Sequence, residues 1–198
     1  MANTAKFDRE KVIRNAMNLF WLKGLKGTST RDLQDSLDMR PGSLYAAFGS
    51  KEGLYKEALT YYAGLMAERL QNYIDEEDST LGGIKRFVHC NILESDFPEE
   101  AHCFLVKTVL EIYEQDSPLL SEAQTLLKKS EENFTRCFQK ALSDGEIPDH
   151  HNPQALGSLL QIQLFGLRSY LRSTQDRDAV KGQIEMFFKG LDTTTAKT

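Results

Sequence analysis

Cysteine, proline and long apolar runs are scarce in this chain of 198 residues, which holds three cysteines and five prolines. Cys90, Cys103 and Cys137 are odd in number and include no C-x-x-C pair, so they predict neither a disulfide framework nor a structural zinc site. No apolar run approaches the ~20 residues that cross a bilayer, and the first residues lack the apolar stretch of a signal peptide. We therefore expect a cytoplasmic protein without a membrane partner.

Segments in which apolar and polar residues alternate are nearly absent, and apolar residues instead recur at spacings of three and four almost throughout. This period is that of amphipathic helices, so the sequence predicts an all-α fold. Gly24 is expected to end the first helix. The expected helices cover residues 8–23, 28 or 29 to 38, 43–48, 50 or 51 to 75, 80–95, 100–114, 118–143, 153–172 and 176–190.

Motifs of common enzymes are also missing. No G-x-S-x-G, H-E-x-x-H, phosphate-binding loop or dinucleotide fingerprint occurs. His150 and His151 are adjacent in a polar turn, and neighbouring loop residues seldom converge on one metal ion. We expect no enzymatic activity, no cofactor and no metal site.

Charge is distributed unevenly along the chain. Residues 1–56 hold ten Lys or Arg against six Asp or Glu, a net charge of +4, whereas the rest of the chain carries −9. A basic head on an acidic body is typical of a protein in which only the head meets phosphates. The charge pattern indicates nucleic-acid binding by the N-terminal part.

The stretch RPGSLYAAFGSKEGLY, residues 40–55, places a very short helix between two breaks. Together with the preceding short helix it fits a helix-turn-helix, in which the second short helix enters the major groove of DNA. Leu44 and Phe48 are four residues apart and are expected to face inward. Arg40, Ser43 and Tyr45 supply the charged and hydroxyl groups that hold phosphates.

The runs GTSTRDL and MRPGSLYAAFGSKEGLYKEAL resemble the N-terminal signature of the TetR family of transcriptional repressors, over residues 8–58. The resemblance implies a homodimer on double-stranded, palindromic operator DNA. It implies a helix-turn-helix domain at 1–50 and a helical effector-binding and dimerisation domain at 51–198. Ala46 and Ala47 follow Tyr45 where many members have a larger polar residue. The DNA contacts carried over are Thr28, Ser29, Arg31, Arg40, Pro41, Gly42, Ser43, Tyr45 and Lys51.

The last two expected helices carry apolar residues on more than one face, which requires either deep burial or a partner chain. Both alternatives remain open from the residues alone. The resemblance implies that these helices pair with their copies in the dimer. The interface residues expected on this basis are Leu156, Leu160, Leu164, Leu167, Leu171, Ile184, Phe187 and Phe188.

A small-molecule effector of unknown identity is expected to bind among the helices at 80–143 and 153–172, or else to react with a thiol. Cys103 follows a Pro-Glu-Glu turn near a helix start, where a thiol is more easily deprotonated, although a small buried apolar role is the alternative. A helical adaptor for other proteins is the alternative function, but it leaves the residue 40–55 signature unexplained. The expected pocket residues are Phe87, Cys103, Phe104, Val109, Tyr113, Phe134, Phe138 and Phe165.

Overall fold

A computed structural model describes residues 8–94, 103–113 and 117–191, and within these ranges the chain forms nine α-helices and no strand. The expected all-α class is confirmed. The chain divides into two compact units, one formed by Met1–Gly64 with Phe104–Leu126 and the other by Leu65–Cys103 with Leu127–Thr198. We call them the N-terminal unit and the C-terminal unit. None of the described helices is long and apolar enough to span a membrane.

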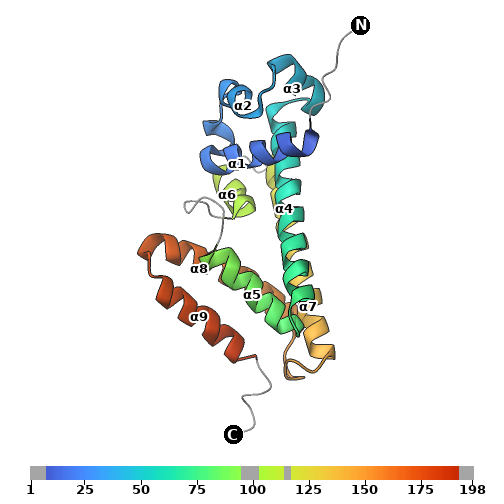
Figure 1. Cartoon of the computed structure of the whole chain (residues 1–198), viewed down its shortest axis with the longest axis vertical. Helices are drawn as coiled ribbons and strands as arrows, with labels where there is room; N and C mark the ends of the chain where they lie inside the picture. Colours follow the sequence, from blue (N-terminus) through green and yellow to red (C-terminus); the bar gives the residue numbers. More distant parts are fainter. Residues whose placement is uncertain (1–7, 95–102, 114–116, 192–198) are drawn as a thin grey trace. The chain divides into compact units, whose positions relative to one another are not determined.

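The N-terminal unit holds six helices or parts of helices among the described residues. In Figure 1, α1, α2 and α3 gather at the start of α4, and α6 lies beside α1. Asp8 caps α1 by accepting a bond from the backbone N–H of Lys11 at 3.1 Å. The elements are α1 (Arg9–Gly27), α2 (Thr30–Leu37), α3 (Pro41–Phe48), the first part of α4 (Lys51–Glu76), α6 (Phe104–Glu111) and the first part of α7 (Pro118–Ser143).

An aromatic cluster forms the core of the N-terminal unit. The rings of Phe20 and Tyr55 meet edge to face with centroids 4.8 Å apart, and Phe104 of α6 packs against Tyr55 at 5.2 Å. Trp21 and Tyr62 meet at 5.0 Å. All five side chains are almost completely buried. Edge-to-face pairs of this kind add to the apolar burial and fix α6 against α1 and α4.

Gly24 breaks α1 rather than ending it. Its φ of 73° and ψ of 173° interrupt the helix, which then continues to Gly27. Two lysines satisfy the carbonyls near this break: Lys107 donates to Trp21 and Leu22 at 2.6 and 3.1 Å, and Lys51 donates to Leu25 at 3.0 Å. Since exposed helix carbonyls need partners, these ammonium groups stabilise the bend.

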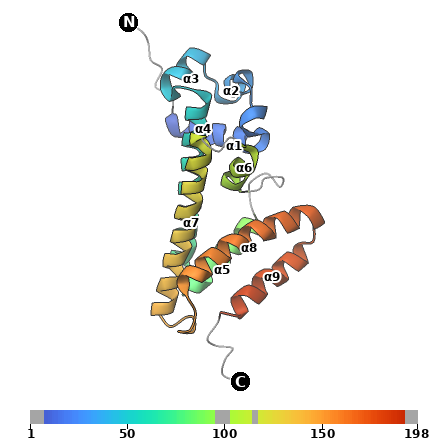
Figure 2. The ribbon, with the colours of Figure 1, turned by 180° about the vertical axis from the view of Figure 1, so that it is seen from behind.

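The C-terminal unit is built from α5 (Thr80–Leu93), α8 (Pro153–Thr174), α9 (Arg177–Lys189) and the remaining parts of α4 and α7. Figure 2 shows α9 doubling back along α8. Glu146 caps the start of α5, since its carboxylate accepts from the N–H groups of Thr80 and Leu81 at 2.9 and 2.6 Å.

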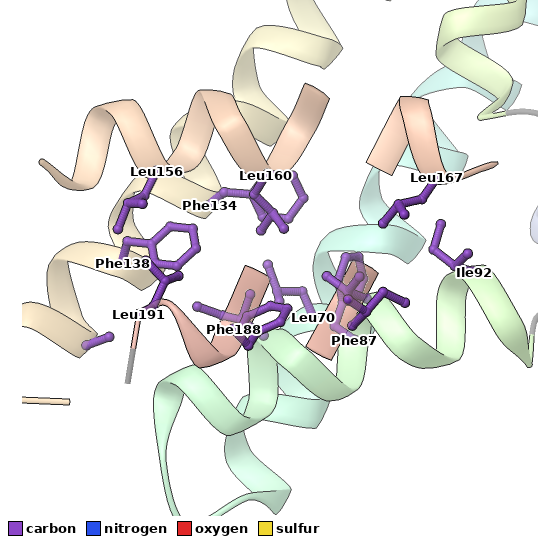
Figure 3. Packing of buried hydrophobic residues seen from close by; sticks show 14 of the residues in the cluster. Leu70, Phe87, Ile92, Phe134, Phe138, Leu156, Leu160, Leu167, Phe188 and Leu191 are labelled. Carbon is purple, nitrogen blue, oxygen red and sulfur yellow. The ribbon is translucent and has the colours of Figure 1, made fainter. Parts of the chain in front are cut away.

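The C-terminal core contains large apolar side chains from all five of these elements. Figure 3 shows Phe134 and Phe138 of α7, Leu156, Leu160 and Leu167 of α8, and Phe188 of α9 around one centre. Gly83 lets α5 approach α4 closely, because a Cβ at this position would lie 2.5 Å from the Cα of Ile74. Much of the apolar surface of α8 and α9 is buried in this core.

Candidate nucleic-acid interface

The start of α2 is fixed by a reciprocal capping box. The backbone N–H of Asp32 donates to Ser29 Oγ at 3.1 Å, and the backbone N–H of Ser29 donates to Asp32 Oδ2 at 2.8 Å. Lys23 of α1 also pairs with the Asp32 carboxylate. The bonds from Lys23 and then Ser29 hold the pKa of Asp32 well below its usual range. Ser29 is exposed but engaged in this cap.

The turn and α3 are positioned from inside by apolar contacts. Asp38 ends α2 in the left-handed conformation with φ 51°, and Pro41 opens α3. Leu44 and Phe48 are buried, as expected from their spacing, together with Leu33 of α2. Only the opposite face of α3 is therefore left for a partner.

That opposite face carries the groups that hold phosphates. Ser43 and Arg40 are exposed, and Tyr45 is 41% exposed with its hydroxyl 3.4 Å from Thr30 Oγ1. No side chain caps α3, so its N-terminus faces outward with hydroxyl groups and an arginine around it. Six of the nine expected DNA contacts are exposed on α2, the turn and α3: Arg31, Arg40, Pro41, Gly42, Ser43 and Tyr45.

Besides Ser29 in its cap, two further expected contacts have structural roles in the protein. The Thr28 side chain is 1% exposed, and its hydroxyl donates to the carbonyl of Gly24 at 2.7 Å, so the expected DNA contact of this side chain is wrong. Lys51 Nζ donates to the carbonyls of Leu25 and Thr28 at 3.0 and 3.1 Å. An ammonium has three donors, so at most one of them is left for a phosphate.

Arg9 is a positioning residue that the sequence did not indicate. Its guanidinium donates to the carbonyl of Ala47 at 3.3 Å, lies 4.5 Å from the ring centroid of Phe48 and pairs with Glu57 at 2.5 Å. It therefore ties the end of α3 to α1 and α4. These partners are 38 and 48 residues away in sequence, so no local spacing signals the contact.

The expected pocket residues do not form one set. Phe87, Phe134 and Phe138 are buried in the core of the C-terminal unit, where the centroids of the Phe87 and Phe134 rings are 6.1 Å apart. These side chains pack against other core residues and do not line a pocket. Phe104 instead completes the aromatic cluster of the N-terminal unit. The remaining four are half-buried or exposed: Cys103, Val109 and Phe165 are half-buried, and Tyr113 is exposed.

A cavity of about 670 Å³ lies in the N-terminal unit, near the end of α1 and the start of α4. Tyr113 is the one expected pocket residue on its wall, which also includes Lys23, Lys26, Lys51 and Glu111. This wall combines charged side chains with apolar ones such as Leu25, Ile112 and Leu119.

The expected interface is corrected for five of its eight residues. Leu156, Leu160, Leu167, Ile184 and Phe188 are at most 7% exposed and pack within the core of their own unit. Burial inside the chain, the alternative left open by the sequence, accounts for these five, since a packed side chain has no surface to offer a second copy. Leu164, Leu171 and Phe187 are half-buried against the same core.

A separate set of apolar side chains remains exposed on α8 and α9. Leu159, Ile162 and Tyr170 share one face of α8, and Met186 lies on α9; they are 41 to 67% exposed. Gly166 and Gly182 lie on the same faces, and nothing is within 4 Å of a Cβ built at either. On α8 no charged residue interrupts this face, whereas on α9 Asp178 and Lys189 lie within a turn of Gly182 and Met186.

Comparison with known proteins agrees with this geometry. The family model of the bacterial regulatory proteins of the tetR family matches residues 12–58, which span α1 to the first part of α4. The HTH-type transcriptional repressor ComR of Escherichia coli K12 is 26% identical over 165 residues, covering 81% of this chain and 78% of ComR.

Solved structures extend the likeness over nearly the whole chain. A cysteine mutant of the TetR family regulator CifR, in complex with a 26-bp double-strand operator DNA, gives a TM-score of 0.82 at 26% identity and covers 96% of this chain and all of CifR. The reduced form of E. coli NemR gives 0.81 at 16% identity, covering 95% and 98%, which supports the fold alone. The chain belongs to the TetR family of transcriptional regulators.

Proposed function

We propose that this chain represses transcription as a homodimer on a palindromic operator and leaves the DNA when an effector binds or when a thiol is modified. The exposed face of α3, held from behind by Leu44 and Phe48, is the observation that carries the DNA-binding part of this proposal. An adaptor without DNA binding has no use for this face, so the repressor is preferred.

On the DNA, α3 lies in the major groove with its N-terminal end toward the backbone. Arg31 and Arg40 neutralise phosphates, while Ser43 and Tyr45 donate from their hydroxyl groups. Ala46 is exposed on the same short helix and offers a methyl group, which suits contact with a thymine methyl rather than hydrogen-bonded readout. Sequence selectivity at this position therefore rests on a small apolar contact.

The dimer interface is assigned to the exposed apolar faces of α8 and α9 in place of the buried residues. Leu159, Ile162, Tyr170 and Met186 supply apolar area, and Gly166 and Gly182 allow a second backbone to approach. Partly apolar faces of this kind are typical of homodimer interfaces. A two-fold dimer then presents two copies of α3 to half-sites about 34 Å apart.

Release from DNA is assigned to α6 and the residue in front of it. Cys103 is half-buried and directly precedes Phe104, which packs into the aromatic cluster, and Lys107 of the same helix bonds the carbonyls of α1. A change at Cys103 therefore reaches α1 through α6. An effector shifts the population only if it binds the DNA-incompetent state more tightly.

The DNA-binding proposal is tested with the purified protein and two labelled DNA fragments, one from upstream of its own gene and one with the same bases scrambled. We expect tighter binding to the upstream fragment and a steep loss of affinity with salt. Equal weak binding to both fragments directs the operator search elsewhere in the genome. Absence of binding to either fragment at low salt contradicts the proposal.

The thiol proposal is tested by alkylation rates of the three cysteines in the native protein. We expect Cys103 to react faster than Cys137, whose thiol has its pKa raised by burial. Loss of operator binding should follow Cys103 modification and be absent in Cys103→Ser. Equal slow rates at all three cysteines contradict this route of release.

A further inference from the structure

Three side chains of different chemistry converge at the end of α5 in the C-terminal unit. His89 Nδ1 lies 3.5 Å from Glu94 Oε1, and Cys90 Sγ lies 3.5 Å from Glu94 Oε2. All three ligand atoms are within 4.8 Å of one another. Residues 89, 90 and 94 form no known metal motif, so the sequence did not indicate this cluster. His150 and His151, the histidines considered in the sequence, are not part of it.

These separations fit the coordination sphere of one small metal ion. Ligand atoms held at 2.0–2.3 Å from a tetrahedral ion are separated from each other by about 3.3–3.8 Å, which brackets the His89–Glu94 and Cys90–Glu94 distances. The third separation, between the His89 and Cys90 ligand atoms, is no more than 4.8 Å. An imidazole, a thiol and a carboxylate form a donor set that suits Zn²⁺ rather than Mg²⁺ or Ca²⁺, which prefer oxygen ligands. We propose that His89, Cys90 and Glu94 bind one zinc ion, with a fourth position left for water or an exogenous ligand.

The surroundings of the cluster agree with this assignment. The side chains of His89 and Glu94 are 30% and 60% exposed, so an ion can enter from solvent. A thiolate and a carboxylate together neutralise the charge of the divalent ion. Arg86, the nearby cation, already pairs with Glu76 and Glu77 at 3.1 and 2.9 Å.

Tyr73 of α4 supports the cysteine from outside. Its hydroxyl bonds the Cys90 thiol, and Arg86 lies 5.1 Å from the centroid of its ring. Such outer partners orient a ligand before the ion arrives.

The test is a zinc titration of the full chain, freed of any histidine tag and treated with chelator, against a chromophoric competitor. We expect one ion per chain with a Kd of about 1 µM or tighter. Cys90→Ser and His89→Gln should each weaken binding at least tenfold. Cys137→Ser and His151→Gln, which alter the same residue types outside the cluster, should bind like the wild type.

Cobalt substitution supplies a second readout that does not depend on DNA. The Co²⁺ protein should show a thiolate-to-metal charge-transfer band, lost in Cys90→Ser and kept in Cys103→Ser. Thermal melts of each variant without metal show whether the fold is intact. No binding by the wild type, equal binding by Cys90→Ser and Cys137→Ser, or loss of the band only in Cys103→Ser overturns the proposal.

Discussion

The ammonium of Lys51 joins three parts of the N-terminal unit. It stands at the first residue of α4 and donates to carbonyls on both sides of the α1–α2 junction, at Leu25 and Thr28. The Thr28 side chain is itself turned inward to Gly24. The junction that orients α2 toward DNA therefore depends on a few polar groups that do not reach the exposed face.

Lys51→Met tests this structural role. The variant keeps most of the apolar stem but leaves two carbonyls without their charged donor, so we expect the free energy of unfolding to fall by about 1–3 kcal/mol. Lys56→Met is the matched control, because the Lys56 side chain is 54% exposed and makes one ion pair, with Glu122 at 3.0 Å, and ion pairs open to solvent contribute about 0–1 kcal/mol. Chemical denaturation measures both; a Lys51→Met protein as stable as the wild type contradicts the role.

At the scale of the element, α2 depends on its N-terminal cap. The Asp32 carboxylate accepts from Ser29 and pairs with Lys23. Its pKa is therefore depressed in the folded protein. An acid whose pKa is lowered by folding stabilises the folded protein at pH values above its unfolded-state pKa, which is about 3.9 for Asp. This contribution is lost as the pH falls toward the lower pKa of the folded state.

Asp32→Asn should consequently lower the Tm most at neutral pH and have a shrinking effect as the pH falls below about 4. Asp35→Asn is the control. The Asp35 side chain is 76% exposed and its ion pair with Arg31 is long, at 3.9 Å, so the effect of this substitution should be small at every pH. Thermal melts between pH 3 and 7 decide the matter. A constant difference between Asp32→Asn and the wild type across that range contradicts the cap assignment.

Element by element, much of the fold is predictable because its signals are local. The Ser29–Asp32 capping box, the burial of Leu44 and Phe48 and the start of α4 all follow from spacings of three or four residues. Gly24 is predicted to end the first helix, whereas α1 continues past it to Gly27, where Lys107, a residue 83 positions after Gly24, bonds the carbonyls near the bend. Periodicity cannot supply such distant partners.

The interface residues show a second limit of local patterns. Periodicity identifies α8 and α9 as apolar on more than one face, yet it cannot decide which face meets the chain's own core. Leu160 and Phe188 are buried in that core, whereas Ile162 and Met186 are exposed. The candidate DNA face was more predictable, because a helix of eight residues with one buried face leaves only one other face.

At the scale of the whole molecule, the exposed apolar faces predict the dimer. Ile162→Glu places a charge on the proposed interface and should weaken dimerisation at least about 100-fold, since an unpaired charge buried in an interface costs several kcal/mol. Leu110→Glu is the matched control: Leu110 is 65% exposed on α6, against 63% for Ile162. Sedimentation equilibrium measures both variants. An Ile162→Glu protein that dimerises like the wild type contradicts the interface.

The central claim is that the exposed face of α3 binds DNA, and the salt dependence of operator binding tests it most directly. Once an operator fragment is in hand, Arg40→Ala removes one phosphate contact per protomer, so the slope of log K against log salt should become shallower by about 1.8 per dimer. Arg136→Ala, an exposed arginine of the C-terminal unit, should leave the slope unchanged. Equal slopes for the wild type and Arg40→Ala would contradict the account.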